Sequence, residues 1–331
     1  MSICIIGSGI IGLSTALAIQ EKEPRAKVTL VAESFSPDVT SDVAAGYWRP
    51  SLLVDPRTDV LWRWGELTFQ HIERLAYREP DTGALWQSGY EMRQDSVKED
   101  FFWKDTVRNY RNISERELQN MGFSQFKSAI FYTTLALEGS IYLPRMLDQF
   151  KRNSGTLQQK RLENLDDIGG SYNAIGNCSG LGAHHLITDT SVYPIRGQTI
   201  RVQAPHIKHF YVFDDDYYVL QNGTSIVLGG THQEHDWDTS VRPADFDHIW
   251  NGNTNFLPAL KTAKIIKQAT GLRPGRPTVR LEAERRAVCG KTKTVVHNYG
   301  HSGSGLTLFY GCALDAADLL QQAVHRPNAK L

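Results

Sequence analysis

Three glycines near the N-terminus have the spacing that lets a backbone turn hold a diphosphate group. They are Gly7, Gly9 and Gly12, in the stretch CIIGSGIIGLSTALAI. In the glycine motif of dinucleotide-binding domains, the first glycine permits a tight turn, the second lets the pyrophosphate approach the backbone, and the third lets a helix pack closely on the strand. The helix that follows would turn its N–H groups and its positive dipole end toward the phosphates. The motif predicts an adenine dinucleotide, and it does not distinguish FAD from NAD.

A strand, a helix and a second strand must position this turn. Residues 3–6 are a continuous apolar run rich in β-branched side chains, which is typical of a parallel strand covered on both faces. Residues 27–32 form a second strand that ends at Glu33, roughly 20 residues after the motif, where an acid would accept a hydrogen bond from a ribose hydroxyl. The alternative is a glycine-rich turn that binds nothing.

The composition excludes several classes of partner. The chain has 331 residues with 36 Lys+Arg and 36 Asp+Glu, so that no bulk charge attracts nucleic acid or an anionic membrane. No apolar run is long enough to span a membrane, and no secretory signal is evident. The cysteines are scattered without the spacing of a metal site, which favours a reducing compartment and no metal: Cys4, Cys178, Cys289 and Cys312.

Short consecutive strands follow in the second half of the chain. The runs 195–202, 209–213, 217–220 and 225–228 predict an antiparallel sheet in a second domain. We expect residues 261–270 to be helical or mixed, residues 271–277 to be a proline-locked loop, and residues 294–299 to be a strand. A second glycine-rich turn at residues 300–307 and a helix at 311–324 close the chain.

Taken together, these segments resemble the FAD-dependent D-amino-acid oxidase and D-aspartate oxidase family. The resemblance covers nearly the whole chain and is carried by GSGIIGLSTALAI, TSDVAAGYWRP, SGYEM, NCSG, PIRGQTIRVQAPHIKHF, LGGTHQEHDWD, TGLRPGRPTVRLEAE and VVHNYGHSGSGLTLFYGCALDAA. It implies an α/β fold (α+β, two domains), in which a Rossmann-type FAD-binding domain is interleaved with a mixed-sheet substrate domain. The implied ranges are 1–50, 140–190 and 273–331 for FAD, and 51–139 and 191–272 for the substrate.

The resemblance also implies the reaction. A D-amino acid transfers the hydride of its Cα to flavin N5, the imino acid hydrolyses to a 2-oxo acid and ammonia, and O2 reoxidises the flavin and yields hydrogen peroxide. The cofactor FAD carries the difficult step, and the protein positions and polarises the substrate. No acid or base on the enzyme is required, and none is assigned.

Site residues carry over from the matching stretches. Arg273 is similar to the arginine that binds the substrate α-carboxylate through two parallel hydrogen bonds. Tyr218 would donate to the same carboxylate, although Tyr217 leaves the register open by one residue, and Gly303 would present a carbonyl to the amine. A loop ion pair for Arg273 and a core position for Tyr218 are the alternatives. The residues implied for FAD are Gly7, Gly9, Ile10, Gly12, Glu33, Thr40, Ser41, Ala45, Gly46, Ser304, Gly305, Leu306 and Thr307.

The substrate side chain is the point at which this sequence departs from its relatives. Mammalian D-aspartate oxidases carry an arginine in a GGTRQ stretch, where this chain has His232, and another after an HF pair, where it has Tyr211. Neutral-substrate enzymes have glutamine where this chain has Arg49. A buried cation favours an anionic partner, so Arg49, with help from His232, predicts a slight preference for D-aspartate or D-glutamate. Two alternatives are neutral D-amino acids such as D-alanine and D-proline, and an Arg49 that points away or pairs with an acid such as Glu282.

Other classes of protein fit less of the sequence. An NAD-linked dehydrogenase shares the first motif and is the remote alternative, and a flavoprotein-like subunit without activity is another. The C-terminal Ala329, Lys330 and Leu331 are a conservative variant of the tripeptide that the peroxisomal import receptor binds. We therefore expect the peroxisome matrix and that receptor as a partner. A homodimer is one candidate assembly, and the sequence does not fix the oligomeric state.

Overall fold

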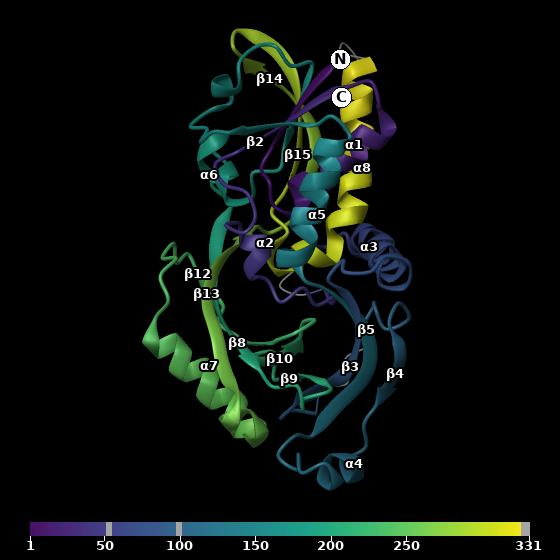
Figure 1. Ribbon diagram of the computed structural model, residues 1–331, viewed down its shortest axis with the longest axis vertical. Helices are drawn as coiled ribbons and strands as arrows, with labels where there is room; N and C mark the ends of the chain where they lie inside the picture. The colour runs from purple at the N-terminus through teal and green to yellow at the C-terminus, as the bar shows by residue number, and fades with distance from the viewer. Residues whose placement is uncertain (51–54, 97–100, 326–331) are drawn as a thin grey trace.

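The computed structural model describes residues 1–50, 55–96 and 101–325, which form two sheets that lie one above the other in Figure 1. Within these ranges the upper sheet has six strands in the order β14–β15–β7–β1–β2–β6. Five of them run parallel, and β14 is antiparallel at the edge. The strands are β1 (Ser2–Ile6), β2 (Lys27–Ala32), β6 (Thr156–Gln159), β7 (Ala174–Asn177), β14 (Arg280–Val288) and β15 (Lys291–Tyr299).

Both faces of the upper sheet are covered, which explains its continuous apolar strands. Ile3 and Ile5 of β1 pack toward α1, α5 and α8, which Figure 1 shows side by side on one face. Cys4 and Ile6 point to the opposite face, because successive side chains of a strand alternate, and they pack in the cluster that contains Leu186. The helices are α1 (Ile10–Lys22), α5 (Gly139–Arg152), α6 (Ala183–Leu186) and α8 (Gly305–His325).

The lower sheet is mixed and strongly curved (Figure 1). Among the described residues it has nine strands in the order β12–β8–β11–β10–β9–β3–β5–β4, with β13 beside β8. Within the described ranges, β3 and β9 form its only parallel pair. The strands are β3 (Ala84–Arg93), β4 (Arg108–Asn112), β5 (Ser128–Leu137), β8 (Tyr193–Gln203), β9 (Phe210–Phe213), β10 (Tyr217–Gln221), β11 (Ile226–Gly229), β12 (Gln233–Glu234) and β13 (Lys264–Gly275).

Three more helices flank the lower sheet and the junction between the sheets. α7 (Pro243–Phe256) packs against β8, β10 and β11, and α4 (Glu115–Asn120) lies at the far end of the molecule. The side chain of Ser114 caps α4 by accepting from the N–H of Glu117 at 3.2 Å, as a helix N-cap does. α3 (Thr58–Arg78) packs on α8. No helix in the described part of the chain is long and apolar enough to cross a membrane.

The expectation of a helical or mixed segment followed by a loop is wrong for residues 264–275. Instead of a helical or mixed segment and a loop, β13 is a long strand paired antiparallel with β8 from Lys264 to Gly275. Tertiary pairing overrides the local signal here. Pro274 is tolerated because β13 pairs with β8 alone among the described strands, so that the missing N–H interrupts no second ladder.

The strands of the two sheets occupy separate sequence ranges. Every strand of the upper sheet falls within 1–50, 140–190 and 273–331, and the strands of the lower sheet fall within 51–139 and 191–272, except the last residues of β13. The helix α3 lies in the range 51–139 but packs on α8, which covers the upper sheet. The domain boundaries themselves stay a prediction.

Candidate active site

A cavity of about 860 Å³ is lined by the ends of the parallel strands of the upper sheet and by strands β10 and β13 of the lower one. It brings together residues that are far apart in the sequence. The predicted residues that line it are Gly7, Gly9, Ile10, Glu33, Thr40, Ser41, Ala45, Gly46, Arg49, Tyr218, His232, Arg273, Gly303, Gly305 and Leu306. Three predicted cofactor residues are not part of this lining: Gly12, Ser304 and Thr307.

The glycine turn forms one wall, and its geometry excludes larger residues. Gly7 has a φ of +102°, and a Cβ there would lie 2.3 Å from the carbonyl oxygen of Cys178. A Cβ on Gly12 would lie 1.8 Å from the carbonyl oxygen of Gly7, so this glycine brings α1 against the strand instead of contacting the cavity. The N–H of Ile10 donates to the Ser41 hydroxyl at 3.1 Å. The first turn of α1 therefore faces the cavity, as a pyrophosphate site requires.

Glu33 lies at the end of β2 and faces the cavity together with a residue that the sequence analysis missed. The guanidinium of Arg161 is 3.3 Å from the carboxylate of Glu33. Arg161 follows β6, the parallel strand next to β2, so that both residues come to the same edge of the sheet. Two basic residues in a row after β6, Lys160 and Arg161, were the available signal. The pair offers both an acceptor and a donor to a ribose or a phosphate.

Arg273 lies on β13 with its guanidinium over Gly197 of β8, where a Cβ would come within 2.4 Å of Nη1. Its Nη1 donates to the carbonyl oxygen of Thr231 at 3.0 Å and approaches that of Ile195 at 3.5 Å. No carboxylate pairs with Arg273 among the described residues, so the loop ion pair considered above is not formed there. The guanidinium is left with donors for a carboxylate ligand.

Tyr218 and Tyr217 point to opposite faces of β10, because side chains alternate along a strand. Tyr218 lines the cavity, and its ring lies over Gly229. The Tyr217 hydroxyl is 3.4 Å from Nδ1 of His248 on α7, and its ring packs against Phe256. Of the two tyrosines, Tyr218 is therefore the one placed to contact a substrate.

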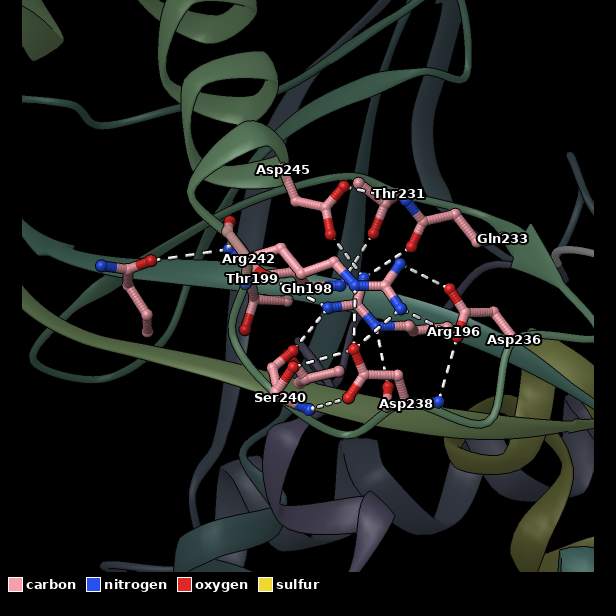
Figure 2. A network of polar contacts seen from close by, with 12 residues as sticks. Arg196, Gln198, Thr199, Thr231, Gln233, Asp236, Asp238, Ser240, Arg242 and Asp245 are labelled. Atoms are coloured by element: carbon pink, nitrogen blue, oxygen red, sulfur yellow. Dashed lines mark hydrogen bonds and ion pairs between the residues drawn. The ribbon is translucent and has the colours of Figure 1, made fainter.

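A buried arginine of β8 holds the loop after β12 and the start of α7 in place (Figure 2). Arg196 of β8 is fully buried, and its guanidinium donates to the carbonyl oxygens of Asp238 at 2.8 Å and Ser240 at 2.6 Å. It also pairs with the carboxylate of Asp245 and the amide oxygen of Gln233. The sequence analysis assigned Arg196 no role, although a single charge within an apolar strand run is a signal of such a network.

The same network reaches the carbonyl that receives Arg273. The N–H of Gln198 donates to the Thr231 hydroxyl at 2.8 Å, and the Gln198 amide exchanges hydrogen bonds with the backbone of Arg242 (Figure 2). Thr231 is thus held by its side chain while its carbonyl accepts from Arg273. These contacts fix the position of Arg273 in the cavity.

Arg49 is not an unpartnered cation. Its Nε lies 2.8 Å from Oε1 of Glu91, and its Nη2 donates to Oε2 of Glu91 at 3.0 Å and to Oδ1 of Asp215 at 3.0 Å. The alternative that Arg49 pairs with a nearby acid is confirmed, but the acid is not Glu282, which pairs with Arg280 at 2.7 Å. The sequence could not show this, since Glu91 lies 42 positions from Arg49 in the chain.

The charge of Arg49 is strongly stabilised in place. Burial by itself would lower the pKa of the guanidinium, but Glu91 and, after it, Tyr132 and Asp215 together outweigh this effect and raise the pKa. Glu91 also accepts a hydrogen bond from the Tyr132 hydroxyl, which in turn contacts that of Tyr47. Arg49 stays in the cavity lining, so that it does not point away.

His232 lines the cavity as a neutral imidazole. Burial, followed by the charge of Arg273, lowers the pKa of His232 to about 4. At neutral pH it can therefore assist as a hydrogen-bonding group and not as a second cation.

Comparison with known proteins places the chain in a family. The family described as FAD dependent oxidoreductase matches residues 2–319. A D-aspartate oxidase of Homo sapiens is 37% identical over 98% of this chain and 95% of its own length. A D-amino acid oxidase of Dugesia ryukyuensis is 36% identical over 97% of both chains, and one of Rubrobacter xylanophilus is 35% identical over 97% and 96%. The chain belongs to the FAD-dependent D-amino-acid and D-aspartate oxidases.

The fold agrees with this assignment. The crystal structure of glycine oxidase from Geobacillus kaustophilus superposes with a TM-score of 0.80 at 17% identity, over 97% of this chain and 94% of that one. The glycine oxidase of Bacillus cereus gives 0.78 at 17% identity, over 98% and 97%. The expected two-domain flavoprotein fold is confirmed, and the NAD-linked alternative is not supported.

The residues present fit the FAD of this family. The glycine turn offers a cradle that any Cβ at Gly7 would fill, and Glu33 with Arg161 lies beside it. Asn298 Oδ1 and His301 Nε2 are buried without a hydrogen-bond partner in the described residues, and both residues line the cavity. Burial lowers the pKa of His301 to about 3, so its imidazole is neutral. Such atoms need a polar ligand to satisfy them.

Proposed function

We propose that this oxidase acts on D-amino acids whose side chain ends in a carboxylate, D-aspartate and D-glutamate. The observation that carries the proposal is Arg49, a cation on the cavity wall that holds a second carboxylate, Asp215, beyond its buried partner Glu91. The Asp215 carboxylate is 44% exposed and sits on a turn. A substrate carboxylate can take its place.

The other end of the substrate is bound by residues of the lower sheet. Arg273 binds the α-carboxylate with its remaining donors, and the Tyr218 hydroxyl donates to the same group. The carbonyl of Gly303, on the turn before α8, receives the amine. Bound FAD would supply the acceptor for the hydride of the substrate Cα, with O2 as the final oxidant that becomes hydrogen peroxide. No acid or base of the protein is needed.

One observation favours the second candidate, neutral D-amino acids. Glu91 already neutralises Arg49, so that this region of the cavity carries no excess positive charge while Asp215 stays in place. If Asp215 is not displaced, an uncharged side chain fits better than a carboxylate.

Peroxide formation by the FAD-saturated protein tests the proposal. We expect kcat/KM to be higher for D-aspartate and D-glutamate than for D-alanine and D-proline, with no turnover of the L forms. In the double variant Arg49→Gln, Glu91→Gln, which removes the cation without leaving a buried anion, kcat/KM for D-aspartate should fall about 10- to 100-fold, the effect of one charge-assisted hydrogen bond. D-Alanine is the internal control. An equal fall for both substrates contradicts the role of Arg49.

The peroxisome matrix is the proposed compartment. The tripeptide Ala329, Lys330 and Leu331 lies outside the described residues and would be bound by the import receptor. A fluorescent fusion with a free C-terminus should give punctate fluorescence, and removal of the tripeptide should make it diffuse. If both forms are diffuse, the proposal fails. The homodimer stays a prediction, which sedimentation of the FAD-bound protein would test.

A further inference from the structure

We propose that Asp215 is a built-in competitor, whose carboxylate occupies the site on Arg49 that the side-chain carboxylate of an acidic substrate takes during turnover. The inference rests on the proposed preference for acidic D-amino acids. It adds a residue that limits this preference, because an acidic substrate must displace it, in contrast to residues that bind the substrate directly.

The two carboxylates on Arg49 are held in different ways. Glu91 is 4% exposed, lies inside β3 and accepts a hydrogen bond from Tyr132. Asp215 is 44% exposed and reaches Arg49 through a single contact of 3.0 Å. Glu91 is therefore a fixed partner, while Asp215 can exchange with another carboxylate, because an exposed ion pair contributes little free energy.

The turn that carries Asp215 can release the side chain without disturbing the sheet. It joins β9 to β10, and both Asp214 and Asp215 adopt left-handed backbone conformations, with φ of 52° and 59°. The turn is closed by backbone, since the N–H of Asp216 donates to the carbonyl of Phe213 at 3.0 Å. Rotation about the Asp215 side-chain bonds is enough to move its carboxylate away from Arg49.

A second arginine keeps Asp215 close after it leaves Arg49. The Asp215 carboxylate also accepts from Nη2 of Arg93 at 2.6 Å. The side chains of Arg49, Arg93, Glu91 and Asp215 carry two positive and two negative charges. An incoming carboxylate would add a negative charge to the wall unless Asp215 turns toward solvent, where its charge is screened.

The cavity places this exchange next to the substrate site. Arg49, Asp215, Tyr218 and Arg273 all line the same cavity. An acidic substrate bound through Arg273 must displace Asp215 to reach Arg49, whereas a neutral substrate leaves the ion pair closed. Asp215 thus weakens the binding of acidic substrates selectively.

The Asp215→Asn variant tests the inference, because asparagine tolerates the left-handed conformation and only the charge is lost. The matched control is Asp216→Asn, which makes the same charge change on the same turn, at a side chain that forms no ion pair in the described part of the chain. Asp215→Asn should lower KM for D-aspartate about three- to five-fold, which corresponds to the free energy of one exposed ion pair. KM for D-alanine should not change. Asp216→Asn should leave the ratio of the two KM values within about twofold of the wild type.

The outcomes separate this inference from the proposed function. The preference of the wild type between D-aspartate and D-alanine tests the proposed function. The change of that preference in Asp215→Asn tests the proposal that Asp215 competes with the substrate. If the wild type prefers D-alanine but Asp215→Asn shifts the ratio toward D-aspartate, the function fails and the competitor stands. If Asp215→Asn does not differ from Asp216→Asn, or raises KM for D-aspartate, the competitor is overturned whichever substrate the wild type prefers.

Discussion

Arg49 pairs with one buried and one exposed carboxylate, so removing the charge of each acid should change the stability of the protein by different amounts. In Glu91→Gln the shape of the side chain is kept, but the buried guanidinium loses the partner that it contacts at 2.8 and 3.0 Å. Breaking a buried pair on one side costs about 3 kcal/mol or more, because the desolvated guanidinium then has only the exposed carboxylate of Asp215 as a counter-charge. In Asp215→Asn the lost pair is 44% exposed on the acid side, and the cost should stay below about 1 kcal/mol.

Urea unfolding of the FAD-saturated proteins measures both costs. We expect the unfolding free energy of Glu91→Gln to fall by about 3 kcal/mol relative to the wild type, and by at least about 2 kcal/mol relative to Asp215→Asn. The double variant Arg49→Gln, Glu91→Gln should recover part of this loss, since it removes both charges. Equal losses for the two single variants would refute the distinction between a fixed and an exchangeable partner.

Three further predictions follow from the cavity and the buried histidines. Arg273→Leu should lower kcat/KM for every D-amino acid by at least about 100-fold, with FAD absorbance retained, because two charge-assisted hydrogen bonds are lost; a fall below tenfold would argue against an α-carboxylate site. Gly12→Ala should weaken FAD binding, seen as loss of flavin on gel filtration, since the added Cβ would lie 1.8 Å from a carbonyl oxygen. The control Gly170→Ala should keep its flavin, because the atom nearest to its added Cβ is 3.5 Å away. Burial, aided by the charge of a nearby arginine, lowers the pKa of His71 from 6.5 to about 3, so protonation favours unfolding and stability is lost as pH falls below 6.5. By pH 5 this histidine should lower the free energy of unfolding by roughly 2 kcal/mol. The loss should be absent in His71→Gln and retained in His206→Gln, a control at an exposed histidine. An equal pH dependence of stability in both variants would contradict the assignment.

The fold of the first 32 residues could be predicted from local signals. The run 3–6 lies within β1, residues 27–32 are β2, and the glycine turn leads into α1 as expected. Each of these signals depends on neighbouring residues alone. β13 could not be predicted in this way, because its pairing with β8 decides its structure, and β14 is a strand with many charges whose pairing with β15 is likewise non-local.

The site was predictable where residue type and chain position suffice, and not where charge partners come from distant strands. Arg273 and Tyr218 share the cavity as the resemblance implied. The partners of Arg49 could not be found, since Glu91 and Asp215 lie 42 and 166 positions away in the sequence. The premise of an unpartnered cation was wrong for this reason, and the structure replaces it with an exchangeable ion pair.

The most direct test of the account is anaerobic reduction of the FAD-bound protein. Mixed with D-aspartate in the absence of oxygen, the protein should lose its visible flavin absorption in a single turnover, and at a lower concentration than with D-alanine. L-Aspartate should leave the spectrum unchanged. Reduction by D-alanine but not by D-aspartate would contradict the assignment of Arg49 to an acidic side chain, and a spectrum that no D-amino acid changes would contradict the oxidase itself.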